Sequence, residues 1–483
     1  VGVLLALGLL VFLAYRGWSI LLLAPVCALI AAAIAGQPLL ANLTQTFLPN
    51  AAHFVGQFFA IFLLGAVFGK LMETSGSVEA IAGFMTRKLG AERAILAIVL
   101  AGAFVTYGGV SLFVAFFVLA PMGHALFRAA DIPHRLMPAA IALGTSTFTM
   151  SAMPGTPAIQ NTIPMPFFDT TPFAAPGLGL IASAIMLGFG LWWLGRAESG
   201  ARRRGEGYAY AYAGPAAPEA SVQAGLVRER AALASEFDPA EIAHGAHVAA
   251  PPPIMVAAAP LVMVVAVNLV MSFAVLPRID AGFLAEPRWG STSLAAVGGV
   301  WSVIVALTAG IVLLLGVNAR RLRGLRETLA AGADAAALPI LSVASLVGFG
   351  AVIAGLPAFE LVKQWLLGIP GGPLVSLAVS ASGLAALTGS ASGGLTIALD
   401  ALAPSFMRLA AESGLDPAAM HRIAVIGAGT LDSLPHNGAV VTLLAVCGAT
   451  HKEAYVDIAM TAIVGALIAL AAVVALASAF GSF

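Results

Sequence analysis

Long hydrophobic runs, separated by short polar breaks, follow one another along almost the whole chain. An α-helix needs about 20 mostly apolar residues to cross the hydrocarbon core of a bilayer. Most of the runs reach that length, so the pattern predicts an all-α protein that crosses the lipid bilayer several times. The runs cover residues 1–14, 19–35, 54–70, 94–121, 137–166, 176–194, 253–276, 291–317, 337–356, 374–403, 421–448 and 456–480.

Two of these runs, 94–121 and 374–403, are interrupted by glycines near their middle. Each is too short for two complete spans and too broken for one. Irregular backbone is tolerated at membrane depth only where protein or a wet cavity surrounds it, so we predict a re-entrant helical hairpin in each. Prolines interrupt two other runs, 137–166 and 421–448, which predicts a broken transmembrane helix in each.

The composition excludes a soluble protein. Sixty per cent of the 483 residues are hydrophobic and 10% are charged, whereas soluble domains carry about 25% charged residues. The 23 basic and 23 acidic residues balance, so nothing favours a nucleic-acid partner. Two cysteines, Cys27 and Cys447, lie in apolar runs, which argues against a disulfide scaffold or a cysteine metal cluster. Because residue 1 is a valine, we expect the natural N-terminus to lie further upstream.

Known catalytic motifs are missing from the sequence. It contains no GxxxxGK[ST], HExxH or GxSxG motif, so neither ATP drive nor an intramembrane hydrolase is supported. We therefore predict a protein that is not an enzyme and needs no cofactor.

Arginines orient the chain in the membrane. Arg196 and Arg202–Arg204 follow one run, and Arg320, Arg321, Arg323 and Arg326 follow another. Two spans separate these clusters, so the positive-inside rule places both in the cytoplasm. The long hydrophilic stretch 195–252 is then a flexible cytoplasmic linker, with a short helix expected around 225–243.

Landmarks recur in the two halves of the sequence at an offset of 281 residues, which predicts an internal repeat. Phe68 matches Phe349, and Pro154 matches Pro435. The predicted organisation is N-terminal transmembrane helices in 1–35, a first repeat in 36–194, the linker in 195–252, connecting transmembrane helices in 253–317 and a second repeat in 318–483.

The two repeats are predicted to have opposite orientations. Residues 36–52 carry no charged side chain, whereas the equivalent stretch 318–336 carries four arginines. If the second stretch is cytoplasmic, the first is external. Inverted repeats with broken helices at matching positions are typical of secondary transporters, which bind their substrate near the bilayer midplane.

Small polar residues and glycines gather at these interruptions, and we predict that they bind the substrate. Glycine lets backbone approach a ligand, helix N-termini favour a carboxylate, and hydroxyl and amide side chains bind hydroxyl groups. An anionic, hydroxylated small molecule fits this set; the alternative is that these residues only pack helices together. The predicted residues are Tyr107, Gly108, Gly109, Ser111, Thr149, Ser151, Gly155, Thr156, Gln160, Asn161, Ser390, Ser392, Gly393, Gly394, Thr396, Ser433, His436 and Asn437.

Asp432 and His436 are the acid and the imidazole inside the interruptions, and we predict that they couple transport to H⁺. The alternative is structural: Asp432 caps the second half-helix and His436 donates a hydrogen bond. Asp400 ranks below them, and a surface role is expected for His53. Na⁺ coupling is the closest competitor, because carbonyls and hydroxyls at hairpin tips also hold Na⁺. An anion channel is a more distant alternative.

Four motifs resemble the gluconate permease (GntP) family of the ion transporter superfamily. They are Phe68–Gly76, Tyr107–Phe113, Met153–Asn161 and Asp432–Ala439, and the likeness extends over nearly the whole chain apart from the linker. The resemblance implies proton-coupled uptake of a hydroxy- or sugar-acid anion, such as gluconate, glycerate, hydroxybutyrate or D-serine, across a bacterial inner membrane. It also implies a homodimer with a scaffold domain and an elevator-like transport domain. The Pro154–Pro157 motif resembles a branch apart from the best-known gluconate carriers.

Overall fold

The computed structural model describes residues 2–15, 18–208, 251–322, 324–435 and 437–483, and every regular element within them is a helix. Eight helices in this part of the chain are long and apolar enough to cross a membrane, or nine if the bent pair Ser77–Leu89 and Ala91–Tyr107 is one span. The predicted all-α architecture of a polytopic membrane protein is therefore confirmed. The inverted orientation of the repeats and the re-entry of the hairpins stay predictions.

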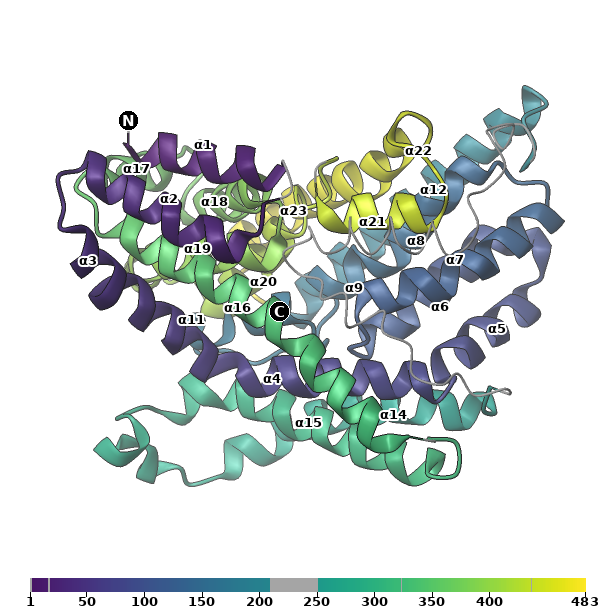
Figure 1. Ribbon diagram of the computed structural model, residues 1–483, viewed down its shortest axis with the longest axis horizontal. Coiled ribbons are helices and arrows are strands. Elements are labelled where there is room, and N and C mark those ends of the chain that lie inside the picture. Colours follow the sequence, from purple (N-terminus) through teal and green to yellow (C-terminus); the bar gives the residue numbers. More distant parts are fainter. Residues whose placement is uncertain (1, 16–17, 209–250, 323, 436) are drawn as a thin grey trace.

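The first half of the chain contributes one very long helix and several short ones around its polar breaks (Figure 1). A π-helical turn at Asn42–Phe47 joins α3 to α4, so Leu39–Thr74 is one helix of 36 residues. The helices are α1 (Gly2–Tyr15), α2 (Ile20–Ile34), α3 (Leu39–Ala41), α4 (Leu48–Thr74), α5 (Ser77–Leu89), α6 (Ala94–Tyr107), α7 (Leu112–Ala129), α8 (Met137–Thr145), α9 (Phe148–Ser151), α10 (Ile159–Thr162), α11 (Met165–Phe168) and α12 (Pro176–Arg203).

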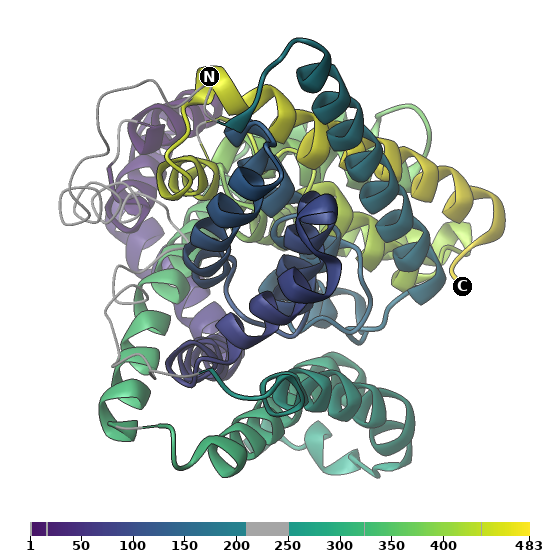
Figure 2. The same cartoon turned by 90° about the vertical axis from the view of Figure 1, so that its right-hand side faces the viewer.

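The second half repeats the order of a long helix, a short amphipathic helix, a helix–turn–helix and a broken helix. Before it, α14 and α15 pack on each other at one side of the molecule (Figures 1 and 2). The helices are α14 (Ile254–Val270), α15 (Leu294–Asn318), α16 (Leu325–Ala354), α17 (Phe359–Leu367), α18 (Pro373–Thr388), α19 (Ala391–Ser413), α20 (Pro417–Ala428), α21 (Gly438–Val446), α22 (His451–Ile458) and α23 (Gly465–Phe480).

The long helices α4 and α16 cross at the centre of the molecule and run antiparallel (Figure 1). Gly332, near the start of α16, lies against Val67 near the end of α4, and Gly348 lies against Phe47. A β-carbon at either glycine would fall 2.8 Å from a backbone atom of the neighbouring helix. Small residues therefore allow the close approach of these two helices, as is common in membranes.

Helices from the two halves of the sequence are interleaved in the hydrophobic cores. One core packs α21 and α22 of the second half against α7 and α8 of the first. Another packs α12 of the first half against α20 and α23 of the second. Neither half therefore buries its apolar surface on its own.

Several predicted boundaries were wrong because polar residues continue helices beyond the apolar runs. Residues 39–52 are helical, and the Thr44 hydroxyl donates a hydrogen bond to the Leu40 carbonyl one turn earlier. Helix α7 continues to Ala129 rather than 121, so it is long enough to cross a membrane alone. Helix α12 continues to Arg203, so the linker does not begin at 195; an Arg202–Glu198 ion pair supports its last turns. The helix expected around 225–243 lies outside the described residues.

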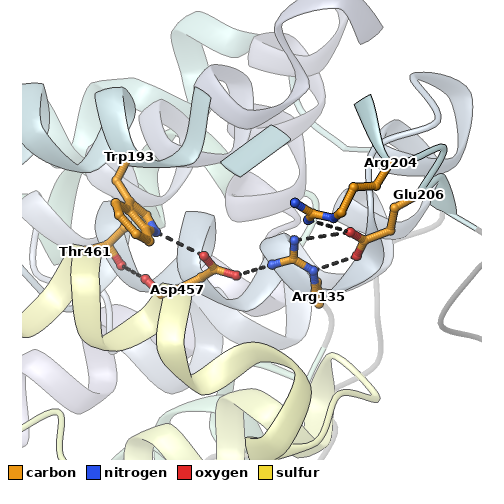
Figure 3. Close-up of polar contacts among 6 residues, drawn as sticks. All are labelled: Arg135, Trp193, Arg204, Glu206, Asp457 and Thr461. Atoms are coloured by element: carbon orange, nitrogen blue, oxygen red, sulfur yellow. Dashed lines mark hydrogen bonds and ion pairs between the residues drawn. The ribbon is translucent and has the colours of Figure 1, made fainter. Parts of the chain in front are cut away.

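A chain of ion pairs joins the loop before α8 to α22 and to the end of α12 (Figure 3). The Arg135 guanidinium lies 2.7 Å from one Glu206 oxygen and 2.5 Å from an Asp457 oxygen. Trp193 Nε1 donates to the other Asp457 oxygen at 3.0 Å, and Arg204 pairs with Glu206 at 3.0 Å. The network connects three segments that are far apart in the sequence.

Glu206 makes this contact sensitive to acid. The hydrogen bond from Arg135 is the main cause that lowers the pKa of the Glu206 carboxyl below its ordinary 4.5. The folded protein therefore binds fewer protons than the unfolded chain near this pH, and stability falls as the pH drops through the folded pKa.

We expect Glu206→Gln to melt at a lower temperature than the wild type at pH 7 and to lose part of the acid-induced decline below about pH 4.5. Thermal unfolding of purified protein from pH 7 to pH 3.5 measures both. Glu412→Gln, at an exposed position, is the matched control. A Glu206→Gln variant whose melting follows the wild type at every pH would contradict the assigned role.

Candidate functional site

The tips of two helix–turn–helix units border one cavity, called here the tip cavity. The first unit is α6–α7, which turns at residues 108–111, and the second is α18–α19, which turns at 389–390. The cavity has a volume of about 170 Å³. Its polar lining comes from Thr106, Gly109, Ser111, Gln160 and Ser392.

The opposite wall of the tip cavity is apolar. It is formed by α4, through Ile61 and Phe62, and by α16, through Ala335 and Val343. None of the described residues that line the cavity carries an ionisable side chain of Asp, Glu, His, Lys or Arg. A ligand bound there therefore contacts hydroxyl, amide and backbone groups on one side and hydrocarbon on the other.

Two long helices begin at this cavity, and a serine caps each of them. Ser111 Oγ accepts from the Phe113 N–H at 3.3 Å at the start of α7, and Ser390 Oγ accepts from the Gly393 N–H at 3.0 Å at the start of α19. Helices of 18 and 23 residues follow. The first turn of a helix carries unpaired N–H groups and the positive end of its dipole. Both helices therefore direct partial positive charge towards the tips.

Glycine is required at both tips. Gly109 has φ 98° and Gly389 has φ 63°, conformations that other residues rarely adopt. A β-carbon at Gly109 would also fall 2.8 Å from Pro157 of the first broken helix. The first tip therefore packs directly on the extended segment between α9 and α10.

Four of the predicted binding residues line the tip cavity: Gly109, Ser111, Gln160 and Ser392. Others are tightly packed outside the lining, because a β-carbon at Gly108, Gly155, Gly393 or Gly394 would fall 2.1 to 2.5 Å from a neighbouring atom. The structure also places Thr106 in the lining. That residue flanks the predicted set and was not included in it.

Most predicted hydroxyls of the first broken helix bond within the protein. Thr149 accepts from Thr106 and donates to the Gly144 carbonyl, while Ser151 donates to the Thr147 carbonyl. Thr156 accepts from the Ala158 N–H. Tyr107 donates to the Pro154 carbonyl at 2.8 Å. These residues hold the broken helix in place behind the cavity.

A smaller hollow of about 20 Å³ adjoins the tip cavity and contains Asp432, Ser433 and Asn437 in its lining. It shares Leu112 and Met150 with the tip cavity. Ser433 donates to the Asp432 carboxylate at 3.2 Å. His436 lies outside the described residues.

Asn437, not Asp432, caps the second half-helix. Its Oδ1 accepts from the Ala439 N–H at 2.7 Å at the start of α21, so the alternative role considered for Asp432 was wrong. Its Nδ2 donates to the Gly389 carbonyl at 2.7 Å. One amide therefore joins the second broken helix to the tip of the second hairpin.

Arg422, on α20, is a buried residue that the sequence analysis missed. Its guanidinium donates to the carbonyls of Ala174 and Pro172 and to Asn161 Oδ1, at 2.8 to 3.3 Å. Its neighbour His421 also contacts Asn161 and lies 2.6 Å from the Thr170 hydroxyl. No ion pair to Arg422 occurs in the described part of the chain.

The Arg422 guanidinium donates hydrogen bonds to backbone carbonyls of the irregular segment 169–175, which are not in a helix. A buried carbonyl without a donor costs about 1–3 kcal/mol. Asn161, which Arg422 holds, follows Gln160 of the cavity lining. Arg422 is therefore a positioning residue. The sequence signal that could have identified Arg422 is a single arginine in the apolar run 421–448.

We expect Arg422→Ala to lower the free energy of unfolding by about 2–4 kcal/mol, because it removes the donors to the buried Ala174 carbonyl and opens a cavity. Melting of the purified protein in detergent measures this. Arg408→Ala, at an exposed pair on α19, should change it by about 0–1 kcal/mol. Equal melting temperatures for the two variants would show that the arginine fork does not stabilise the fold.

Comparison with known proteins identifies relatives of nearly the whole chain and of parts of it. A sequence profile of GntP family permeases matches residues 1–165. Over 464 residues the chain is 40% identical to the uncharacterized transporter YxjC of Bacillus subtilis (strain 168), with 94% of each protein covered. A segment of 107 residues, 22% of this chain and 23% of the relative, is 33% identical to the inner membrane permease YgbN of Escherichia coli (strain K12).

Two solved structures share the fold at low sequence identity. MtrF of Neisseria gonorrhoeae, described within a class of antimetabolite efflux pumps, is 16% identical with a TM-score of 0.53; 91% of this chain and 84% of MtrF are covered. The YdaH transporter of Alcanivorax borkumensis is 17% identical with a TM-score of 0.51, covering 92% and 89%. These likenesses concern the fold alone.

The expectations of a membrane transporter rather than an enzyme, and of a multi-pass inner-membrane protein, are confirmed by these relatives and by the eight apolar helices. The resemblance seen in the four motifs is confirmed as well: the chain belongs to the GntP family of permeases.

Proposed function

We propose that this permease takes up a small hydroxycarboxylate anion together with H⁺, and that alternating access is of the elevator type. The observation that carries the proposal is the meeting of two serine-capped helix N-termini at one cavity whose described lining has no charged side chain. Such termini stabilise a carboxylate without a fixed countercharge.

The lining suits a short acid with few hydroxyl groups. Ser111, Ser392 and Gln160 supply polar groups on one wall, and a hydrocarbon face of the ligand would rest on Phe62 and Val343. One water needs about 10–15 Å³ of such space, so a cavity of about 170 Å³ holds a small organic acid. Glycerate and hydroxybutyrate match a cavity with one polar and one apolar wall better than the longer, fully hydroxylated gluconate does.

Proton coupling is supported by Asp432, which lies beside the tip cavity rather than in it. Binding the anion with at least one proton would let a proton gradient drive uptake, and Asp432 with His436 would carry that proton. Na⁺ remains the alternative coupling ion, since the carbonyls and hydroxyls of both tips also suit a cation.

The apolar wall supports an elevator-type movement. Ile61, Phe62 and Val343 make no directional bonds across the cavity, so the polar hairpin tips can shift along α4 and α16 without breaking hydrogen bonds there. A homodimer built on the scaffold helices would hold that wall fixed in the membrane.

Uptake of labelled glycerate, hydroxybutyrate and gluconate into proteoliposomes tests the proposal. An inward proton gradient of about one pH unit should give about tenfold accumulation of the preferred acid if one proton is coupled, with or without Na⁺. Accumulation that needs Na⁺ and ignores pH would favour the alternative. Conductance without accumulation would identify a channel.

Ser392→Ala should raise the KM for the preferred acid about 10-fold or more, the effect of losing one hydrogen bond to a charged group. Ser478→Ala, on the exposed face of α23, is the control. Wild-type kinetics for Ser392→Ala would place the substrate elsewhere.

Asp432→Asn should abolish accumulation driven by pH while exchange of labelled for unlabelled acid continues.

A further inference from the structure

A second polar cavity lies between α4 and α19, one to two helical turns further along α19 from the second hairpin tip than Ser392. Its volume is about 170 Å³. Asn50, His53 and Gln57 of α4 face Thr396 and Asp400 of α19 across it, and Val347 of α16 contributes to the wall. We call it the α4–α19 cavity.

The α4–α19 cavity and the tip cavity follow one seam between the same helices. On α19, Ser392 lines the tip cavity, and Thr396 and Asp400 line the second cavity. Residues four apart lie on one face of a helix, so these three form a polar stripe that connects the two cavities. On α16 the same step separates Val343 from Val347. Thr396 donates to the Ser392 backbone carbonyl at 2.7 Å, a bond within α19.

Asp400 is a half-buried carboxylate on a helix long and apolar enough to cross the membrane. Within the described residues, no hydrogen bond or ion pair to its side chain is found. A charge in such a position is costly, and it usually marks an ion or proton pathway. The carboxylate therefore needs a proton, a cation or a charged partner.

His53 is the titratable group that faces Asp400 across the cavity. Helix α16 presents Val347 there, and the α11 segment presents Pro166 and Phe167. Helix α18, which packs along α19, has no titratable residue, and α10 has none. On α20, His421 and Arg422 point to Thr170, Asn161 and the carbonyls of the 172–174 loop.

The position of the α4–α19 cavity along α4 indicates which side of the membrane it is closer to. His53 lies nearer the start of the helix Leu39–Thr74 than Ile61 and Phe62 of the tip cavity do. The arginines after α15 orient the antiparallel helix α16 with its start in the cytoplasm. The start of α4 is then external, so the α4–α19 cavity lies on the outer side of the tip cavity.

We propose that the α4–α19 cavity is the outer proton-uptake site of the transporter, in which Asp400 accepts a proton from the external solution and His53 is its partner. The inference rests on the proposed proton coupling. Hydronium transfers one proton to the carboxylate, which leaves neutral Asp400 and water; transfer of that proton inward, to Asp432 and His436 of the proposed coupling, restores the carboxylate.

The proton also changes the charge that α19 carries at this seam. Charged Asp400 faces His53 of α4 across the cavity, whereas neutral Asp400 leaves no charge there on α19. A neutral side chain is cheaper than a charged one at membrane depth, so protonation lowers the cost of moving α19 along α4. Asp432 lines the smaller hollow that adjoins the tip cavity.

Proteoliposomes loaded with a pH-sensitive dye test the site, with labelled hydroxybutyrate and glycerate as the probes. Asp400→Asn should reduce pH-driven accumulation from about tenfold, the value for one proton and one pH unit, to equilibration, and should abolish substrate-induced proton influx. Substrate exchange should stay within about twofold of the wild type. Asp400→Glu should restore accumulation, and His53→Gln should shift the dependence of uptake on external pH.

Asp334→Asn, at an exposed position on α16, is the matched control and should accumulate substrate normally. If the wild type shows no pH-driven accumulation, the proposed function fails, and this inference fails with it. If the wild type accumulates and Asp400→Asn does so equally, only the role of Asp400 is overturned. Loss of both exchange and substrate-induced thermal stabilisation in Asp400→Asn would show a structural role and overturn the inference as well.

Discussion

The need to bond every interrupted stretch of backbone inside a membrane governs this structure. Lipid offers no hydrogen bonds, so a carbonyl or N–H released by a broken helix must find its partner in the protein. Tyr107 serves the Pro154 carbonyl, Arg422 serves the 172–174 loop, and Asn437 serves Gly389. The breaks that suit ligand binding can exist only because these side chains complete them.

The same need explains why the halves of the chain are interleaved. Arg422 belongs to the second half and holds a loop of the first, and α21 packs on α7. At the tip cavity, α4 and α16 supply a hydrocarbon wall that needs no polar partner. The result is a polar face built by the hairpins and broken helices, with an apolar wall beside it.

Sequence patterns were sufficient for what depends on local chemistry. Apolar runs predicted the helices, and Gly109 and Gly389 marked the turns, because a positive φ leaves few other choices. The ends of α7 and α12 were misplaced, since helices continue past the apolar run; at the end of α12 an ion pair and a back-bond support the added turns.

Long-range partners could not be predicted in the same way. The bond from Asn437 to Gly389 joins residues 48 apart, and those from Arg422 to the 172–174 loop join residues about 250 apart. Nothing in the local pattern distinguishes Ser392, which lines the tip cavity, from Thr396, which lines the next one. Which polar residue faces a ligand is decided by tertiary packing.

The amide of Asn437 has a consequence for how the second half can change shape. It satisfies the start of α21 with its oxygen and the Gly389 carbonyl with its nitrogen. Separating the hairpin from the broken helix would expose an acceptor, and losing the amide altogether would expose helix donors too, at about 1–3 kcal/mol for each buried group. The tip and the helix break are thus fastened to each other, and a movement that separates them would leave these groups without partners.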